Sequence, residues 1–107
     1  MIVYNVTVSI DESVHEEWIK WMVREHIPEV MATGLFLENR FCKIIGQEEG
    51  GKSYSIQYLA ETEEKYNAYL ENHAQELQAK HIEKFNGKFG AFRTLLDVIH
   101  IMQLEKK

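Results

Sequence analysis

The stretch Ile-Val-Tyr-Asn-Val-Thr-Val-Ser-Ile, residues 2–10, alternates between two kinds of side chain. Its even-numbered positions are all large and apolar, whereas its odd-numbered positions are mostly small or polar. Alternation with period two and many β-branched residues is typical of a strand buried on one face. The stretch therefore predicts a strand whose apolar face meets helices, with Asn5 and Thr7 on the face that the helices leave uncovered.

A helical pattern follows this strand, because apolar residues recur every three or four positions. Ser13 with Glu16 fits a capping box at the start of the helix, and Asp11 is the alternative cap. Pro28 removes a backbone N–H, so we expect a kink there or a new short helix. Gly34 suits the left-handed position that ends a helix.

The remaining apolar patterns complete an order of strands and helices. They predict strands over residues 35–45, 52–60 and 88–102, and a long helix that begins at Thr62 and bends near Asn72. The resulting βαββαβ order predicts an α+β fold of the ferredoxin-like type. In this fold a four-stranded antiparallel sheet carries both helices on one face.

Composition excludes several classes of protein. The chain has 107 residues, a net charge of −5 and one cysteine, so we expect a single domain over residues 1–107 without internal disulfides. An acidic chain without a basic block is poorly suited to a phosphate backbone, so we expect no nucleic-acid partner. We find neither the basic start of a signal peptide nor the ~18 apolar residues of a membrane span. We therefore expect a cytoplasmic protein with no membrane partner.

Residues 46–53, Gly-Gln-Glu-Glu-Gly-Gly-Lys-Ser, match the P-loop pattern. That motif works when a helix begins at the Lys-Ser pair and directs its N–H groups at phosphates. Here the residues from Tyr54 to Tyr58 alternate and predict a strand, and Glu48 and Glu49 would repel phosphate. We therefore interpret the segment as the turn of a β-hairpin.

The length of the chain leaves one face of the predicted sheet without a covering layer. We expect a second copy of the chain to close over this face, which makes a homodimeric barrel with an interior cavity. A monomer with a solvated sheet face is the alternative. If Phe92 and Leu96 face the helices, Arg93 shares the uncovered face with polar residues of the central strands.

A ligand site follows from this placement, with Arg93 as its charged member. An arginine inside a barrel needs an anion, and Asp97 lies about 13 Å further along the same strand. A bound carboxylate or phosphate is one candidate partner, and an ion pair with an acidic side chain of either subunit is the alternative. The facing of residues 35–45, and so the role of Arg40, stays open. The predicted ligand-binding residues are Asn5, Thr7, Ser55, Gln57 and Arg93.

His26 and His81 are the candidate catalytic residues, because histidine acts as an acid or base near neutral pH. A buried structural role is the alternative for both. The histidines lack the spacing of a zinc site, so we expect no metal, and nothing in the sequence implies a cofactor.

Four segments of the chain resemble a family of uncharacterised bacterial proteins. They are V-Y-N-V-T-V (3–8), W-I-K-W-M-V-R-E-H-I-P-E-V-M (18–31), G-K-S-Y-S-I-Q-Y (51–58) and H-I-E-K-F-N-G-K-F-G-A-F-R-T-L-L (81–96). That family belongs with the dimeric α/β-barrel superfamily, so the resemblance implies a ferredoxin-like protomer and a homodimer. It implies no reaction, because related barrels include cofactor-independent monooxygenases, haem-degrading enzymes and ligand-binding regulatory modules.

Three functions remain open at this point. The first is a barrel that binds a small polar or anionic molecule between the sheet and the partner subunit. The second is a cofactor-independent oxygenase or isomerase with His26 or His81 as its base. The third is a structural or interaction module whose inner face is filled by its own side chains.

Overall fold

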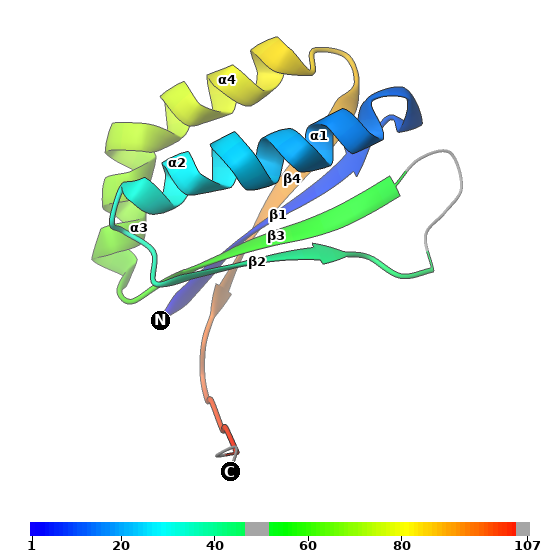
Figure 1. The fold of residues 1–107 in the computed structure, drawn as a ribbon. Helices are drawn as coiled ribbons and strands as arrows, with labels where there is room; N and C mark the ends of the chain where they lie inside the picture. The colour runs from blue at the N-terminus through cyan, green and yellow to red at the C-terminus, as the bar shows by residue number, and fades with distance from the viewer. Residues whose placement is uncertain (47–51, 105–107) are drawn as a thin grey trace.

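Four strands form one antiparallel sheet in the computed structural model, which describes residues 1–46 and 52–104 (Figure 1). The strand order β2-β3-β1-β4 places the first and third strands at the centre and confirms the predicted ferredoxin-like sheet. The two edge strands are shorter than the sequence pattern predicts. The strands are β1 (Ile2–Ile10), β2 (Glu38–Lys43), β3 (Lys52–Ala60) and β4 (Phe89–Asp97).

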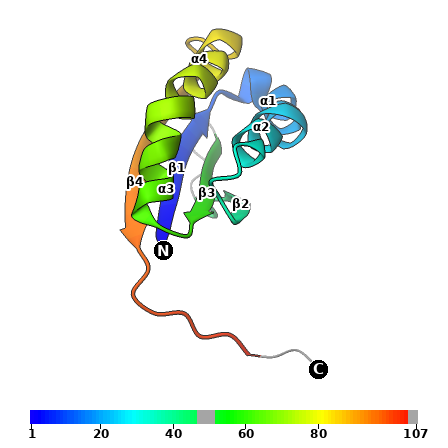
Figure 2. The same cartoon turned by 90° about the vertical axis from the view of Figure 1, so that its left-hand side faces the viewer.

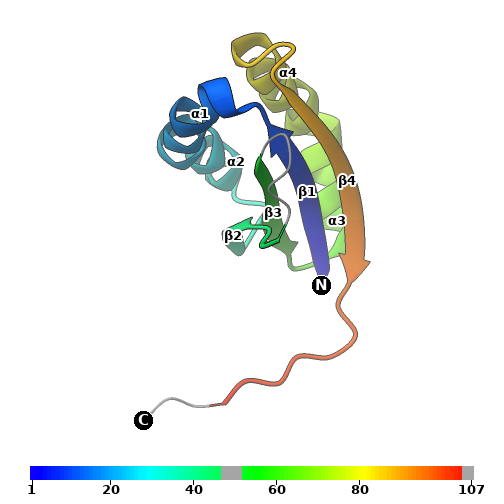
Figure 3. The same cartoon turned by 90° about the vertical axis from the view of Figure 1, so that its right-hand side faces the viewer.

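Two interrupted helical runs cover the same face of this sheet (Figure 3). The first contains a 3₁₀ turn (Glu12–Val14), α1 (His15–Trp21), a π-helical segment (Met22–His26) and α2 (Ile27–Ala32). The second contains α3 (Glu63–Tyr69), a π-helical segment (Leu70–Ala74) and α4 (Gln75–Lys84). After β4 the chain leaves the sheet and extends away from the fold (Figure 2).

The predicted kink at Pro28 takes the form of a widened turn. The N–H of Ile27 bonds to the carbonyl of Met22, five residues back, rather than to the residue four back. Pro28 has no N–H with which to continue the regular ladder, so the turn before it is free to widen. The expected bend near Asn72 is a second π-helical segment. Such segments within α-helices are frequent at functional sites.

Caps fix where the helices begin and end. A carboxylate oxygen of Asp11 accepts from the backbone N–H of Ser13 at 2.9 Å and from its hydroxyl at 2.6 Å. The alternative cap is therefore the right one, and the Ser13 capping box is wrong because the Ser13 hydroxyl is bound to Asp11. Thr62 caps α3 by accepting from the N–H of Lys65 at 3.2 Å. Gly34 ends α2 with a φ of 76°, as predicted.

Strand register decides which face each side chain takes, because directly paired residues of antiparallel strands share a face. Asn5 pairs with Gln57, and Thr7 pairs with Ser55. These four residues lie on the face without helices, as predicted, and we call it the uncovered face.

The predicted facing of β4 is wrong. Arg93 pairs with Val6, so its side chain lies on the helix side of the sheet. Phe92 pairs with Thr7 and therefore lies on the uncovered face. Apolar residues occupy both alternating sets of β4, so the pattern alone could not choose between the faces.

The hydrophobic core fills the space between the sheet and the helices. Its largest fully buried side chains are Trp18, Phe85, Ile10, Ile56 and Val30. Aromatic rings dominate this layer, and Trp18 meets Phe41 edge-on with 5.4 Å between ring centroids. The strand that begins at Lys52 contradicts a P-loop, whose Lys-Ser pair begins a helix. Residues 47–51 of the predicted turn lie outside the described residues.

Shortening Ile56 tests how much the core depends on the central strand. Ile56 is 1% exposed, so Ile56→Ala removes buried methyl groups and leaves a cavity. We expect the free energy of unfolding to fall by about 3 kcal/mol in a urea titration. Ile99→Ala is the control, because Ile99 is 88% exposed and its truncation should leave the transition midpoint unchanged. Equal losses in the two variants would contradict this account of the core.

Candidate functional site

A cavity of about 270 Å³ lies between the sheet and the two helical runs. Its floor is formed by β1 and β3, its roof by the first π-helical segment, α2 and α4, and its open side by β4. Its lining residues are Tyr4, Val6, Val8, Met22, His26, Val30, Ile56, Tyr58, Tyr69, Gln78, His81, Ile82, Phe89, Ala91 and Arg93. Most of these side chains are apolar or aromatic, and a few are polar, which is typical of a small-molecule site.

His81 comes from α4 and is buried in the roof of the cavity. Its Nε2 accepts a hydrogen bond of 2.9 Å from the indole Nε1–H of Trp18. An indole nitrogen only donates, so Nε2 must hold a lone pair and the proton of the neutral ring lies on Nδ1. The contact with Trp18 therefore fixes the tautomer of His81.

His26 lies beside His81, although the two residues belong to different helical runs. Their ring centroids are 5.7 Å apart, and Trp21 stacks on His26 at 4.9 Å. The Nδ1 atom of His26 is buried and has no hydrogen-bond partner among the described residues. A buried polar atom without a partner is rare enough to call for a functional explanation.

Both histidines are neutral at physiological pH. Burial lowers the pKa of His26 from 6.5 to about 4, and Lys80 adds to the lowering while Glu29 opposes it. Burial also lowers the pKa of His81 from 6.5 to about 4, with further lowering from His26 and Arg93. A neutral imidazole can accept one proton at one nitrogen and donate a hydrogen bond from the other.

Arg93 supplies the positive charge of the cavity from the edge strand β4. Its Nε donates to the hydroxyl of Tyr4 at 3.0 Å. No carboxylate in residues 1–46 or 52–104 lies within ion-pair distance of its guanidinium. Every residue of β4 after Phe89 is exposed, so Arg93 meets solvent at the open side of the cavity. The alternative partner for Arg93, an acidic side chain of the same subunit, is thus absent from the described residues.

The other four predicted ligand-binding residues form a separate polar cluster on the uncovered face. Ser55 donates to the side-chain oxygen of Asn5 at 2.5 Å, and Asn5 donates to Thr7 at 3.1 Å. Gln57 donates to Ser55 at 3.4 Å. The structure therefore does not bring Arg93 together with this cluster, because the sheet separates them.

Arg40 also lies on the uncovered face, since it pairs with Gln57. Its Nε is 3.6 Å from a carboxylate oxygen of Glu38, and both side chains are at least half exposed. An exposed ion pair of this kind contributes little to stability.

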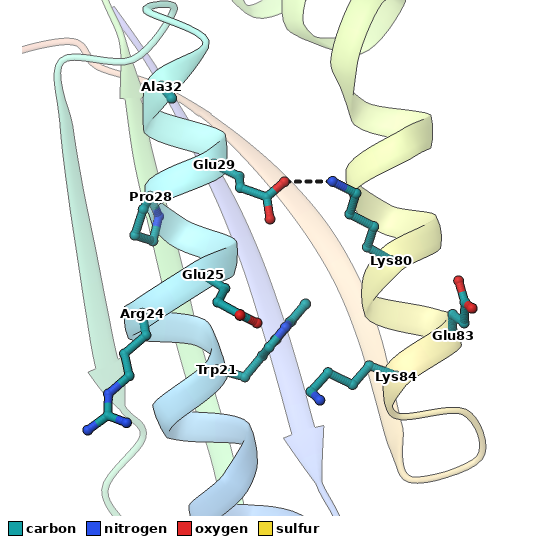
Figure 4. Close-up of a pocket in the computed structure, with 9 residues that line it drawn as sticks. All are labelled: Trp21, Arg24, Glu25, Pro28, Glu29, Ala32, Lys80, Glu83 and Lys84. Atoms are coloured by element: carbon teal, nitrogen blue, oxygen red, sulfur yellow. Dashed lines mark hydrogen bonds and ion pairs between the residues drawn. The ribbon is translucent and has the colours of Figure 1, made fainter.

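A wider surface groove of about 810 Å³ lies between the first helical run and α4 (Figure 4). Trp21 lines it, together with charged residues of both helical runs. Glu29 and Lys80 join across it at 2.7 Å. Figure 4 shows the Trp21 side chain between the two helices. The same ring stacks on His26. Glu29 and Lys80 already neutralise each other, whereas Arg93 of the internal cavity has no acidic partner among the described residues, so the internal cavity is the stronger candidate.

Neither a metal-binding cluster nor a membrane-spanning helix occurs in the part of the chain that the structure describes. Within residues 1–46 and 52–104, no group of three or more His, Cys, Asp or Glu residues is arranged to hold a metal ion. None of the helices in that part of the chain is both long and apolar enough to cross a membrane.

The sequence pointed to Arg93, His26 and His81 of the cavity but not to the aromatic rings that support them. Tyr4 belongs to the apolar face of the first strand, and Trp18 and Trp21 belong to the apolar pattern of the first helix. Each of these rings contacts a histidine or Arg93. Helical spacing shows that the tryptophans share a face, but it gives no sign of a histidine from the other helix.

The lowered histidine pKa values predict a pH-dependent stability. The unfolded chain binds protons below about pH 6.5, whereas the folded protein resists them until about pH 4. Stability is therefore full above pH 6.5 and is lost as the pH falls toward 4, by about 3 kcal/mol in the free energy of unfolding for each of the two histidines. Urea titrations from pH 7 to pH 4 measure this loss.

A matched pair of variants assigns this loss to the cavity. His26→Phe should flatten the pH dependence, because its ring cannot bind a proton. His100→Phe should not change it, since His100 is exposed. If the free energy of unfolding of His26→Phe changes with pH as steeply as that of wild type, the assignment is contradicted.

Solved structures similar to this chain share its fold. One is a dimeric ferredoxin-like protein from an uncultured marine organism, with a TM-score of 0.71 and 13% identity, covering 97% of this chain and 100% of that chain. Another is the heme-degrader MhuD from Mycobacterium tuberculosis with two hemes bound in its active site. Its TM-score is 0.70 and its identity is 15%, and the match covers 96% of this chain and 100% of that chain. A third is an EthD family protein from Bacillus halodurans. Its TM-score is 0.66 and its identity is 13%, and the match covers 92% of this chain and 100% of that chain. At these identities the similarity shows the fold alone.

The comparison with curated proteins gives no match. A family described as a domain of unknown function, DUF4286, matches residues 1–99 and therefore nearly the whole chain. This match agrees with the resemblance to uncharacterised proteins found in the sequence. The chain belongs to the DUF4286 family, with a ferredoxin-like fold.

Proposed function

We propose that this protein binds a small anionic molecule with an apolar body in the cavity between its sheet and its helices. The observation that carries the proposal is the meeting of Arg93, His26 and His81 around one cavity of about 270 Å³. Arg93 lacks an acidic partner among the described residues, and a ligand carboxylate would supply one. The proposal keeps the ligand chemistry predicted from the sequence but moves the site to the other face of the sheet.

The volume of the cavity sets the size of the ligand. A cavity of about 150 Å³ is large enough for benzene, so 270 Å³ suits one ring with a short acidic side chain. Heme is a ligand of the similar MhuD structure. A macrocycle of four pyrrole rings does not fit this cavity without movement of the helices, so the proposal concerns a smaller molecule.

The orientation of the ligand follows from the placement of the charges. Arg93 stands at the open side, on a strand that is exposed along nearly its whole length. The two neutral histidines and most of the apolar lining residues are less exposed than Arg93. A carboxylate at Arg93 keeps contact with solvent, while the ring lies among the aromatic and aliphatic walls, where its burial stabilises the complex.

Binding of benzoate, with uncharged benzamide as the matched control ligand, tests the proposal. Trp21 stacks on His26, so tryptophan fluorescence should report a ligand in the cavity. We expect saturable quenching by benzoate and weaker binding of benzamide. Arg93→Met should raise the Kd for benzoate about tenfold or more, because it removes a charge-assisted hydrogen bond.

The control variant is Arg24→Met, because Arg24 lines the outer groove rather than the cavity. It should leave the Kd for benzoate unchanged. Equal affinity of wild type and Arg93→Met would contradict the role of Arg93. Absence of saturable quenching by both ligands at millimolar concentration would overturn the proposed function.

We also propose that two copies of the chain associate through their uncovered sheet faces. Phe92 and Leu96 lie on this face and are 63% and 46% exposed. Burial of apolar side chains that are grouped on a sheet face favours association with a partner that covers them. The dimeric state of a similar protein of this fold supports the proposal.

Light scattering at micromolar concentration tests the dimer. We expect a species of twice the chain mass in wild type and a shift toward the monomer in Phe92→Ser. Leu95→Ser is the matched control, because Leu95 is similarly exposed, at 51%, but pairs with Tyr4 on the helix side of the sheet. A monomeric wild type would overturn the proposal.

A further inference from the structure

The two histidines of the cavity differ in the nitrogens that they leave free. His81 uses Nε2 to accept from Trp18, so it can offer a ligand only the N–H of Nδ1. His26 has no hydrogen bond from its ring to any described residue, so it can take the tautomer that presents a lone pair. One ring is therefore a fixed donor, and its neighbour is free to act as a base.

Arg93 completes this asymmetry. It is close enough to His81 for its charge to affect that ring, and its charge lies at the open side of the same cavity. A positive charge and a neutral N–H donor stabilise negative charge that develops on an oxygen between them. A base next to such a pair favours reactions in which a proton leaves carbon and the charge moves to oxygen.

We propose that the cavity catalyses keto–enol proton transfer on small 2-oxo carboxylates, with His26 as the base and His81 as the donor to the carbonyl oxygen. The inference rests on the proposed function, since the substrate must first bind at Arg93. It also assigns different roles to the two histidines that the sequence left as equal candidates.

The step balances without an oxidant or a cofactor. His26 takes the proton from the carbon beside the ketone, so the C–H bond breaks and an N–H bond forms. The C–H electron pair becomes the C=C bond, and the C=O π pair moves to the oxygen, which the Nδ1–H of His81 stabilises by a hydrogen bond. The imidazolium of His26 then gives its proton to that oxygen, which yields the enol and restores the neutral ring.

The 2-oxo carboxylate class follows from the chemistry of these groups. A neutral imidazole is a weak base, so the C–H bond must be acidified by an adjacent carbonyl group. The carboxylate provides the anion for Arg93, and the cavity volume leaves room for one ring. Phenylpyruvate has each of these features and is the probe for the test.

Trp18 is a positioning residue in this scheme. It is fully buried, and its indole holds His81 in the tautomer with the proton on Nδ1. Trp18→Phe would leave both nitrogens of His81 free and would allow the other tautomer. The ¹⁵N chemical shifts of the His81 ring report the tautomer directly, and they are a readout that a loss of packing alone would not move.

The experiment follows phenylpyruvate in D₂O by ¹H NMR and measures exchange of its C3 hydrogens. Wild type should accelerate exchange by about a hundredfold over free imidazole at the same concentration. His26→Asn should return the rate to that of imidazole. His81→Leu should also lose the acceleration, and the exposed control His100→Asn should retain it.

Binding and exchange together separate the inference from the proposed function. Saturable binding by wild type without faster exchange would overturn the proton transfer and leave ligand binding intact. Full activity in His26→Asn would overturn the role of His26. If wild type binds none of the three ligands phenylpyruvate, benzoate and benzamide, both proposals are overturned. Because wild type alone decides the main result, a variant that fails to fold does not remove the test.

Discussion

The indole of Trp18 donates to Nε2 of His81 at 2.9 Å, and this hydrogen bond joins the two helical runs above the sheet. Both side chains are buried, so neither has water as an alternative partner. A buried donor left without an acceptor costs about 1 to 3 kcal/mol, which makes this contact a strong constraint on the spacing of the helices. The same bond selects the tautomer of His81. Helix packing and the chemistry of the cavity therefore depend on one interaction.

The cavity opens to solvent beside the fourth strand, whose residues after Phe89 are all exposed. Two helical runs cover the central strands, but β4 is exposed along nearly its whole length. Arg93 can therefore keep its charge in contact with solvent while its Nε bonds to Tyr4. The π-helical segment that ends at His26 carries this ring into the roof of the cavity, where it meets His81. An edge strand and an irregular turn together create a site that neither regular element would provide.

The opposite face of the sheet serves a different physical purpose. Asn5, Thr7, Ser55 and Gln57 bond mainly to one another, so the centre of this face is polar and satisfied. Phe92 and Leu96 lie beside them as exposed apolar residues. A polar centre with apolar residues along the β4 edge fits a face that meets a second sheet, and such a face needs no ligand to explain its composition.

The sequence by itself determined the order of the elements, the central strands and residues at which helices begin and end. Alternation in residues 2–10 and the cap at Thr62 are local features, and local physics is sufficient to interpret them. It also pointed to Arg93, His26 and His81, because burial of a charged or titratable residue within an apolar segment is unfavourable unless the residue has a partner. The facing of β4 could not be read, since both of its alternating sets carry apolar residues. Only the pairing of Arg93 with Val6 decided that facing, and only helix packing placed Trp18 against His81. Register and packing join residues that are far apart in the sequence, so the tertiary structure alone decided where the candidate site lies.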